Sequence, residues 1–207
     1  MRNIFFILFL LIGFSSKAQL YQKDEKFHVG MKAGLGPTIL FGDELKNAKT
    51  KISFQGGVFF KHRLGQSLHF QSEALASYKG GKFDNGVGSY ERVSLLYLDF
   101  PQYLQIDVSN KTNKHIVFLG PQAGFLLSSE VYVNGAFKAK YRDLNLKKMD
   151  AMGVVGYQFN GYYTGFQVAI KYGLVDVNKN LYFKDVLPET GTGKTIRNAS
   201  IDFSFLF

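Results

Sequence analysis

The sequence predicts an all-β fold, an eight-stranded antiparallel transmembrane β-barrel with short periplasmic turns and long extracellular loops. Three observations predict it. Eight segments alternate apolar and polar residues, which is the period of a strand whose two faces meet different surroundings. The connections between these segments are alternately long and short. No segment after residue 18 approaches the roughly 18 consecutive apolar residues that a membrane-spanning helix needs.

The two ends of the chain predict its compartment. Residues 1–18 have the pattern of a signal peptide, with Arg2, an apolar run and the small-x-small site Ser16-Lys17-Ala18. The run is too short to cross a bilayer core of about 30 Å. Residues 19–207 then form a single barrel domain. The last strand alternates and ends on Phe207, which resembles the signal read by the barrel-assembly machinery. We therefore expect a Gram-negative outer-membrane protein with both termini in the periplasm.

Composition narrows the possible partners. The net charge is +9, and removing Arg2 and Lys17 leaves 9 − 2 = +7. The cations are scattered along the chain, which favours contact with anionic lipopolysaccharide over nucleic acid. The chain has no cysteine, which excludes disulfides, thiolate metal sites, thiol catalysis and a lipoprotein anchor.

The first four predicted strands cover 27–36, 52–63, 67–79 and 92–106. In the first three, one face carries aromatic and aliphatic residues and the other carries polar residues and glycine. Pro101 interrupts the alternation of the fourth, so its facing stays open. The polar face of the first three includes His28, Lys32, Ser53, Gln55, Lys61, Arg63, His69, Gln71 and Glu73.

The last four predicted strands cover 115–128, 146–159, 162–175 and the C-terminal segment. Their polar face includes Gln122, Lys148, Asp150, Gln158, Gln167, Lys171, Asp202 and Ser204. A proline cannot donate to the strand ladder, so a bulge or local irregularity is expected at Pro101 and at Pro121.

The lengths of the connections assign the two ends of the barrel. The short ones, 64–66, 107–114 and Asn160-Gly161, are expected in the periplasm. Asn-Gly is a strong signal for a two-residue hairpin turn. The long ones, 37–51, 80–91, 129–145 and 176–195, are then extracellular loops.

The polar faces are predicted to meet inside the barrel, because eight strands leave room only for their own side chains. The expected interior charge network, with a structural role, comprises Lys32, Lys61, Arg63, Glu73, Asp150, Lys171 and Asp202. A two-residue turn at Asn160-Gly161 would place Asp150 opposite Lys171 as a cross-strand ion pair. Asp202 is expected to pair with Lys32, and Glu73 with Lys61 or Lys32.

No catalytic, cofactor or metal site is predicted. None of the four histidines is followed two residues later by serine, as lipid A deacylase barrels require, and none lies in a long loop, as the acyltransferase barrels require. His69 and Glu73 are about 13 Å apart along an extended strand, too far to share a metal ion. Gly191-Thr-Gly-Lys-Thr195 lacks the upstream glycine of a phosphate-binding loop. The sequence therefore favours a protein that is not an enzyme.

Four motifs add a family resemblance: Leu98-Asp-Phe-Pro-Gln-Tyr-Leu104, Leu119-Gly-Pro-Gln-Ala-Gly-Phe-Leu-Leu127, Lys148-Met-Asp-Ala-Met-Gly153 and Tyr172-Gly-Leu174. With them the chain resembles the PorT-like outer-membrane β-barrel family. The resemblance implies a small barrel, and the name-giving member is linked to protein secretion across the outer membrane. The shared motifs are architectural and carry no functional residue.

Two functions follow as hypotheses. The first is a non-enzymatic scaffold or accessory component of a secretion or assembly complex in the envelope. The alternative is an adhesin-like barrel whose loops bind a ligand, lipopolysaccharide or a surface; a narrow pore ranks below both. Expected partners are outer-membrane lipid, the assembly machinery and envelope proteins. Candidate loop contacts are Tyr132, Phe137, Lys138, Lys140, Tyr141, Arg142, Tyr182 and Phe183.

Overall fold

The computed structural model describes residues 26–42, 48–84, 90–109, 114–133, 136–139, 146–161, 164–177 and 195–207. Its strands are β1 (Phe27–Phe41), β2 (Ala48–Lys49), β3 (Lys51–Arg63), β4 (Leu68–Asp84), β5 (Tyr90–Asp107), β6 (Lys114–Val133), β7 (Ala136–Ala139), β8 (Met149–Asn160), β9 (Gly165–Gly173) and β10 (Arg197–Leu206). Within these ranges, no helix has the length and apolarity needed to cross a membrane.

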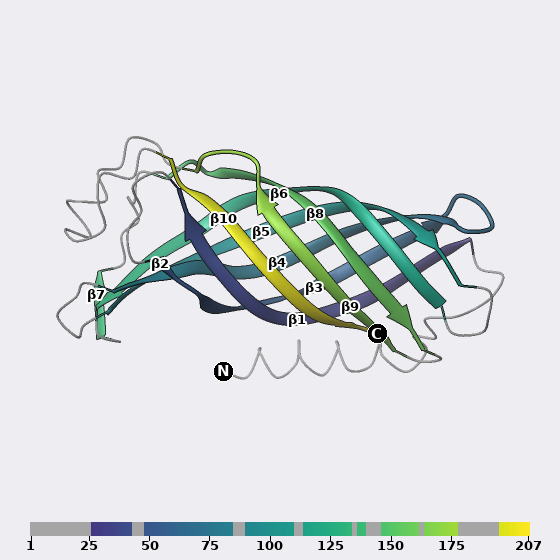
Figure 1. Cartoon of the computed structure of the whole chain (residues 1–207), viewed down its shortest axis with the longest axis horizontal. Coiled ribbons are helices and arrows are strands. Elements are labelled where there is room, and N and C mark those ends of the chain that lie inside the picture. Colours follow the sequence, from purple (N-terminus) through teal and green to yellow (C-terminus); the bar gives the residue numbers. More distant parts are fainter. Residues whose placement is uncertain are drawn as a thin grey trace, which may run out of the picture.

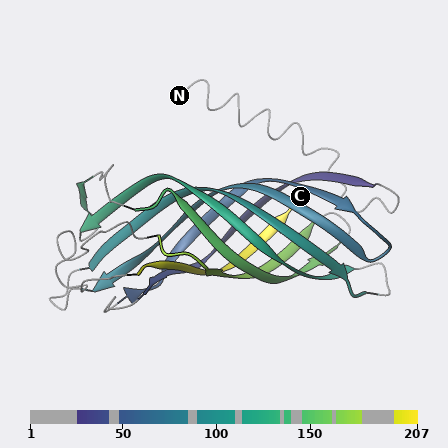
Figure 2. The same ribbon diagram turned by 90° about the horizontal axis from the view of Figure 1, so that it is seen from above.

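Eight of these strands close into an antiparallel barrel (Figures 1 and 2). Each of the eight pairs with the next along the chain, and β10 returns to pair with β1. The two short strands are additions at one end, where β2 pairs with β4 and β7 pairs with β6. The predicted fold class and all eight predicted strands are confirmed.

The alternation places side chains as predicted. Large apolar residues such as Phe54, Leu119 and Val155 point outward and are more than half exposed. Polar residues such as Lys32 and Gln71 point inward and are buried. Apolar outside and polar inside is the arrangement that a barrel surrounded by lipid requires.

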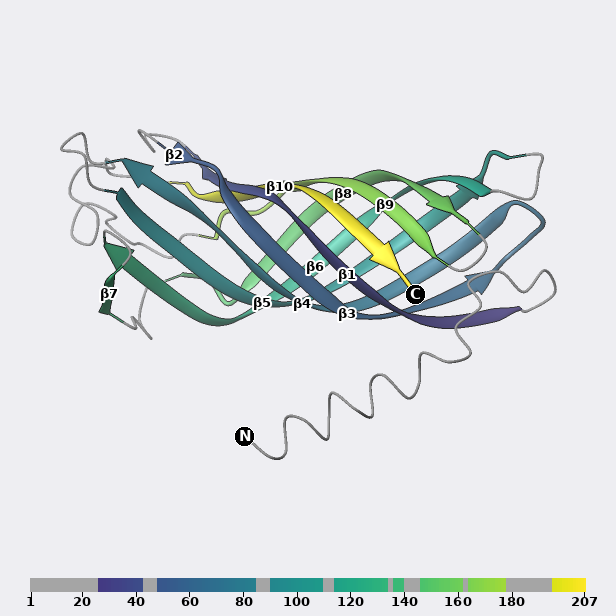
Figure 3. The same ribbon diagram turned by 90° about the horizontal axis from the view of Figure 1, so that it is seen from below.

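The wall is much taller on one side than on the other. Strands β4, β5 and β6 have 17, 18 and 20 residues, whereas β8, β9 and β10 have 12, 9 and 10. Pairing of β4 with β5 continues to Asp84 and Tyr90, and pairing of β5 with β6 continues to Glu91 and Val133. We call this extension, with β2 and β7 at its sides, the outer sheet (Figure 3). Large parts of the predicted loops 80–91 and 129–145 are therefore strand.

The two prolines disturb the ladder without shifting it. Between β5 and β6, pairing lapses at Gln102 and Tyr103, opposite Gly120 and Pro121, and resumes in the same register. The register shift in this pair of strands lies instead between Leu96 and Tyr97. The expected irregularity is present, but it is a gap in the ladder rather than a bulge.

The turn between β8 and β9 is longer than predicted. Asn160 pairs with Gly165, and the amide of Gly161 donates to the carbonyl oxygen of Thr164 at 2.9 Å. The hairpin thus turns over four residues, 161–164. Lys171 consequently lies opposite Val154 rather than Asp150, so the predicted Asp150–Lys171 ion pair is wrong. The shift is an even number of residues, so the predicted facing of both strands survives it.

Candidate functional site

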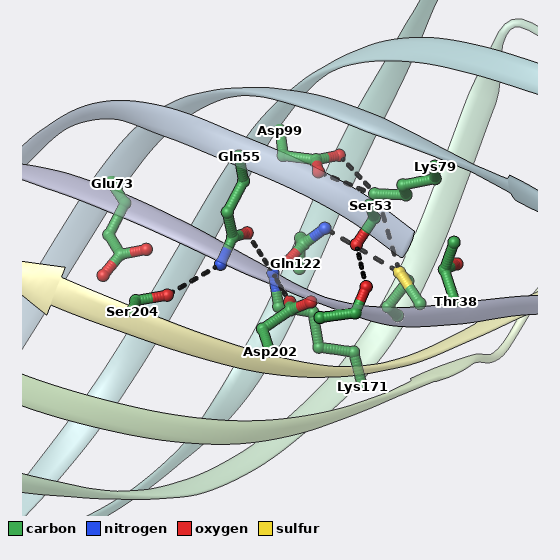
Figure 4. A network of polar contacts seen from close by, with 12 residues as sticks. Thr38, Ser53, Gln55, Glu73, Lys79, Asp99, Gln122, Lys171, Asp202 and Ser204 are labelled. Carbon is green, nitrogen blue, oxygen red and sulfur yellow. Dashed lines mark hydrogen bonds and ion pairs between the residues drawn. The ribbon is translucent and has the colours of Figure 1, made fainter. Parts of the chain in front are cut away.

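Buried ion pairs form a layer across the middle of the barrel (Figure 4). The amino nitrogen lies 2.8 Å from a carboxylate oxygen in Lys32–Glu73 and in Lys79–Asp99, and 2.9 Å in Lys171–Asp202. All six side chains are at most 6% exposed. We call these three pairs the charged layer. Its charges lie in the interior as pairs, and several partners differ from the predicted ones.

The Lys32–Glu73 pair joins two strands that are not neighbours, because β3 lies between β1 and β4. Gly57 of β3 stands opposite Lys32 and has no side chain, so the lysine can reach across it. The amide of Gln71 also donates to Glu73, at 2.6 Å, and the ring of Tyr103 lies 5.6 Å from the Lys32 nitrogen. A carboxylate with several donors and a cation against an aromatic face are stable without water.

The Lys171–Asp202 pair joins the neighbouring strands β9 and β10. Lys171 also donates to Gln55 at 2.9 Å, and Gln55 donates to Ser204 at 3.0 Å, so the network crosses the barrel from β9 to β3 and back to β10. The predicted direct pair of Asp202 with Lys32 is therefore wrong. Asp150, which was predicted to bind Lys171, instead accepts a hydrogen bond from Asn198 at 2.8 Å.

The Lys79–Asp99 pair was not predicted from the sequence. Lys79 was the last residue of its predicted strand, and the facing of the strand around Pro101 was left open. The signal was available, because Asp99 alternates with Tyr97, Tyr103 and Gln105, all of which are buried. Besides Asp150, two predicted members lie outside the charged layer. Arg63 donates to the carbonyl of Gly65 in the turn after β3 at 3.0 Å, and Lys61 lies near the charges of Asp107 and Lys114.

Uncharged side chains fill the described interior on both sides of the charged layer. Toward the extracellular end lies an apolar group, which we call the outer cluster, of Leu40, Phe83, Val93, Leu95, Tyr97, Leu146, Val177 and Ile196. Toward the periplasmic end, Tyr103 packs on Phe118 with ring centroids 4.8 Å apart. Beyond them the amide of Gln105 donates to Gln71 at 2.8 Å. Such an interior stabilises the barrel by packing and pairing.

The described residues offer no metal centre, since nowhere among them do three histidine or carboxylate side chains converge. Of the candidate loop contacts, Tyr132 is described, and it belongs to β6 rather than to a loop. Phe137 and Lys138 fall in β7, where the backbone alone is described. The others, Lys140, Tyr141, Arg142, Tyr182 and Phe183, lie outside the described residues.

Phe207, the predicted assembly signal, is 43% exposed beside the barrel seam. Its backbone nitrogen and oxygen both bond to Met31 at 2.9 Å. The last residue therefore takes part in closing the barrel, because these two bonds extend the ladder between β10 and β1. Its role as a recognition signal stays a prediction.

An eight-stranded barrel with apolar residues outside and paired charges inside defines a class, the small integral β-barrels of Gram-negative outer membranes. The chain belongs to the outer membrane protein beta-barrel domain family, whose model matches residues 15–178. The protein is accordingly placed in the outer membrane of a Gram-negative bacterium.

Two solved structures are similar to the chain at low sequence identity. Ail, the attachment invasion locus protein of Yersinia pestis, is 10% identical with a TM-score of 0.45, over 88% of this chain and 97% of that one. Ail in complex with the heparin analogue sucrose octasulfate is likewise 10% identical, with a TM-score of 0.47, over 88% and 98%. No curated protein matches the chain.

Proposed function

We propose that this protein is a non-enzymatic, adhesin-like barrel that binds an anionic ligand outside the cell through its outer sheet and extracellular loops. The observation that carries the proposal is the height of β4, β5 and β6. In β6 the strand continues six residues beyond Leu127, the last large apolar residue that is exposed on it. At about 3.3 Å per residue this is about 20 Å of paired strand beyond the apolar surface.

A sheet that rises above the membrane has no role in spanning it, because about 9–11 tilted residues suffice for that. Strands β9 and β10 cross with 9 and 10 residues. The additional residues of β4, β5 and β6 therefore support a function at the extracellular surface. The basic residues Lys138, Lys140 and Arg142 follow β6 in the chain and favour an anionic ligand.

The scaffold hypothesis is the second candidate, and one observation favours it. Among the described residues, β7 pairs with β6 alone, so its other edge can accept a strand from a partner. An envelope protein bound there would make the barrel a component of a larger complex. A role in secretion, which the PorT-like resemblance implies, belongs to this second candidate.

The test of the main proposal uses the full protein in lipid nanodiscs, with heparin as the anionic probe. A triple variant, K138Q/K140Q/R142Q, is expected to bind at least tenfold more weakly and with a smaller dependence on salt concentration. The control is Lys26→Gln/Lys114→Gln, which removes two cations at the periplasmic end. Equal binding by wild type and triple variant would refute the anionic-ligand proposal. An envelope protein that co-purifies in fixed ratio from native membranes would favour the scaffold.

A further inference from the structure

The outward face of the outer sheet carries Tyr78, Lys82, Arg92, Glu130 and Tyr132. The side chain of Lys51 in β3, which is 6% exposed, reaches this group, and we call the six residues the rim cluster. Register places most of its members side by side. Lys82 pairs with Arg92 and Arg92 with Tyr132, which forms one row across β4, β5 and β6. In the next row toward the membrane Gly80 pairs with Ser94, and Ser94 with Glu130. Tyr78 follows in the third row.

Lys51 completes the cluster from β3. Its amino nitrogen donates to the hydroxyl of Ser94 at 2.9 Å and to the carbonyl of Lys79 at 3.2 Å, and it lies 4.3 Å from the ring centroid of Tyr78. The empty face of Gly80 leaves room for this approach. Gly80 has φ +140°, and a β-carbon there would come within 2.1 Å of the carbonyl oxygen of Val93.

Tyr78 and Tyr132 hold Glu130, the acidic residue of the cluster, in place. The hydroxyls of Tyr78 and Tyr132 both donate to Glu130, at 3.1 and 2.6 Å. The guanidinium of Arg92 stacks on the ring of Tyr132 at 4.7 Å, and its Nε is buried without a hydrogen-bond acceptor in the described part of the chain. The carboxylate of Glu130 thus lies in a cluster that also carries Lys51, Lys82 and Arg92, and the directly opposed like charges of Lys82 and Arg92 repel each other.

The height of the cluster on the wall indicates where its ligand lies. Phe54, which pairs with Tyr78, is 59% exposed, and Leu127, just below Glu130 on β6, is 61% exposed. Ile52, two residues further along β3, is still 54% exposed. The cluster therefore overlaps the upper edge of the apolar surface, at the level of the lipid headgroups of the outer leaflet. A phosphate monoester carries about −1.5 to −2 charges, and arginine binds phosphate through two nitrogens.

We propose that the rim cluster is a binding site for the phosphate of a glycolipid in the outer leaflet, held against the outer wall between β3 and β6. Arg92 and Lys51 are its principal phosphate ligands, Lys82 adds charge, and the two tyrosines position Glu130 and Arg92. The site lies on the outer wall at the level of the headgroups and is independent of the proposed loop ligand.

The test measures lipid retention by native mass spectrometry of the folded full chain in detergent, with diphosphorylated lipid A as the probe. The double variant K51Q/R92Q is expected to bind at least tenfold more weakly than wild type. Lipid A from which both phosphates have been removed should bind wild type as weakly. The matched control is Lys148→Gln, which removes an exposed cation that precedes β8 at the same end of the barrel.

Three results would overturn the proposal: equal binding by the double variant, equal binding of dephosphorylated lipid A, or equal loss in the Lys148 control. Displacement by inorganic phosphate at the same concentration as the lipid would replace the glycolipid with a free anion as ligand. Arg92→Lys keeps the charge and removes the planar fork, so an intermediate affinity is expected if the double variant does not fold. In that case, wild-type affinity in Arg92→Lys would remove Arg92 from the site.

Discussion

The membrane-embedded part of the barrel and the outer sheet are made from the same strands with opposite polarity. In the lower part of β4 and β5, Ala76 and Leu104 are exposed while Glu73 and Asp99 are buried. In the upper part, Lys82 and Arg92 face outward while Phe83 and Val93 are buried in the outer cluster. The difference shows that the alternation persists along each strand while its polarity inverts where lipid outside is replaced by water.

The physical reason lies in the solvent on each side of the wall. Lipid accepts apolar side chains at no cost, so the embedded wall can place its polar residues inside, where they must pair. Above the membrane, water covers the outer face and the hydrophobic effect drives apolar residues inward, as in a soluble protein. Strands β4 and β5 therefore each contribute side chains to two cores, the charged layer and the outer cluster.

Breaking the charged layer should have the largest effect. Asp202→Leu leaves the amino group of Lys171 buried without its carboxylate, and loss of one partner of a buried pair costs about 3–5 kcal/mol. The free energy of unfolding in urea, measured in lipid vesicles, checks this. The double variant Lys171→Met/Asp202→Leu should recover most of the loss, because it leaves no uncompensated charge. A single variant as stable as wild type would contradict a structural role for the pair.

A cavity in the outer cluster should have the next largest effect. Leu95 is fully buried there, so Leu95→Ala should lower the free energy of unfolding by about 2–5 kcal/mol. The same urea titration measures it, with Leu64→Ala as a control, since Leu64 is 52% exposed in the turn after β3. Equal losses at the two positions would show that the outer cluster does not act as a packed core.

Lysine substitutions on the outer face should show at what height on the wall the outward-facing residues change from apolar to polar. Val155 is half exposed near the middle of β8, where Val155→Lys should cost about 2–4 kcal/mol. Ser128 lies beside the rim cluster on β6, where Ser128→Lys should cost about 0–1 kcal/mol because the residue is near the interface. Equal costs would place Ser128 within the lipid and move the proposed border upward.

The sequence predicted the membrane part better than the outer sheet. Alternation identified all eight strands and the inward facing of Lys32, Glu73, Lys171 and Asp202. It ended β4 at Lys79, because Gly80-Gly81 has the pattern of a turn, whereas the strand continues through both glycines to Asp84. Because the predicted strand ended at Lys79, neither the Lys79–Asp99 pair nor the outer sheet was predicted.

Partner choice was the other failure. The Asn160-Gly161 signal predicted a two-residue turn, whereas the chain turns over 161–164, so a register computed from the turn was wrong by four residues. Lys32 of β1 reaches Glu73 of β4 across β3, so the register of adjacent strands could not decide between Lys32 and Lys61 as the partner of Glu73. The rim cluster was missed for a related reason, since its members come from four strands.

Outside the fourth strand, the sequence by itself determined which residues share a face, because successive side chains of an extended chain point to opposite sides whatever their neighbours are. Only the tertiary structure decided which residues meet. Contacts depend on turn length, on the register at which β10 closes on β1, and on the curvature that brings β1 near β4. Those quantities are properties of the closed barrel, and no single segment of the chain contains them.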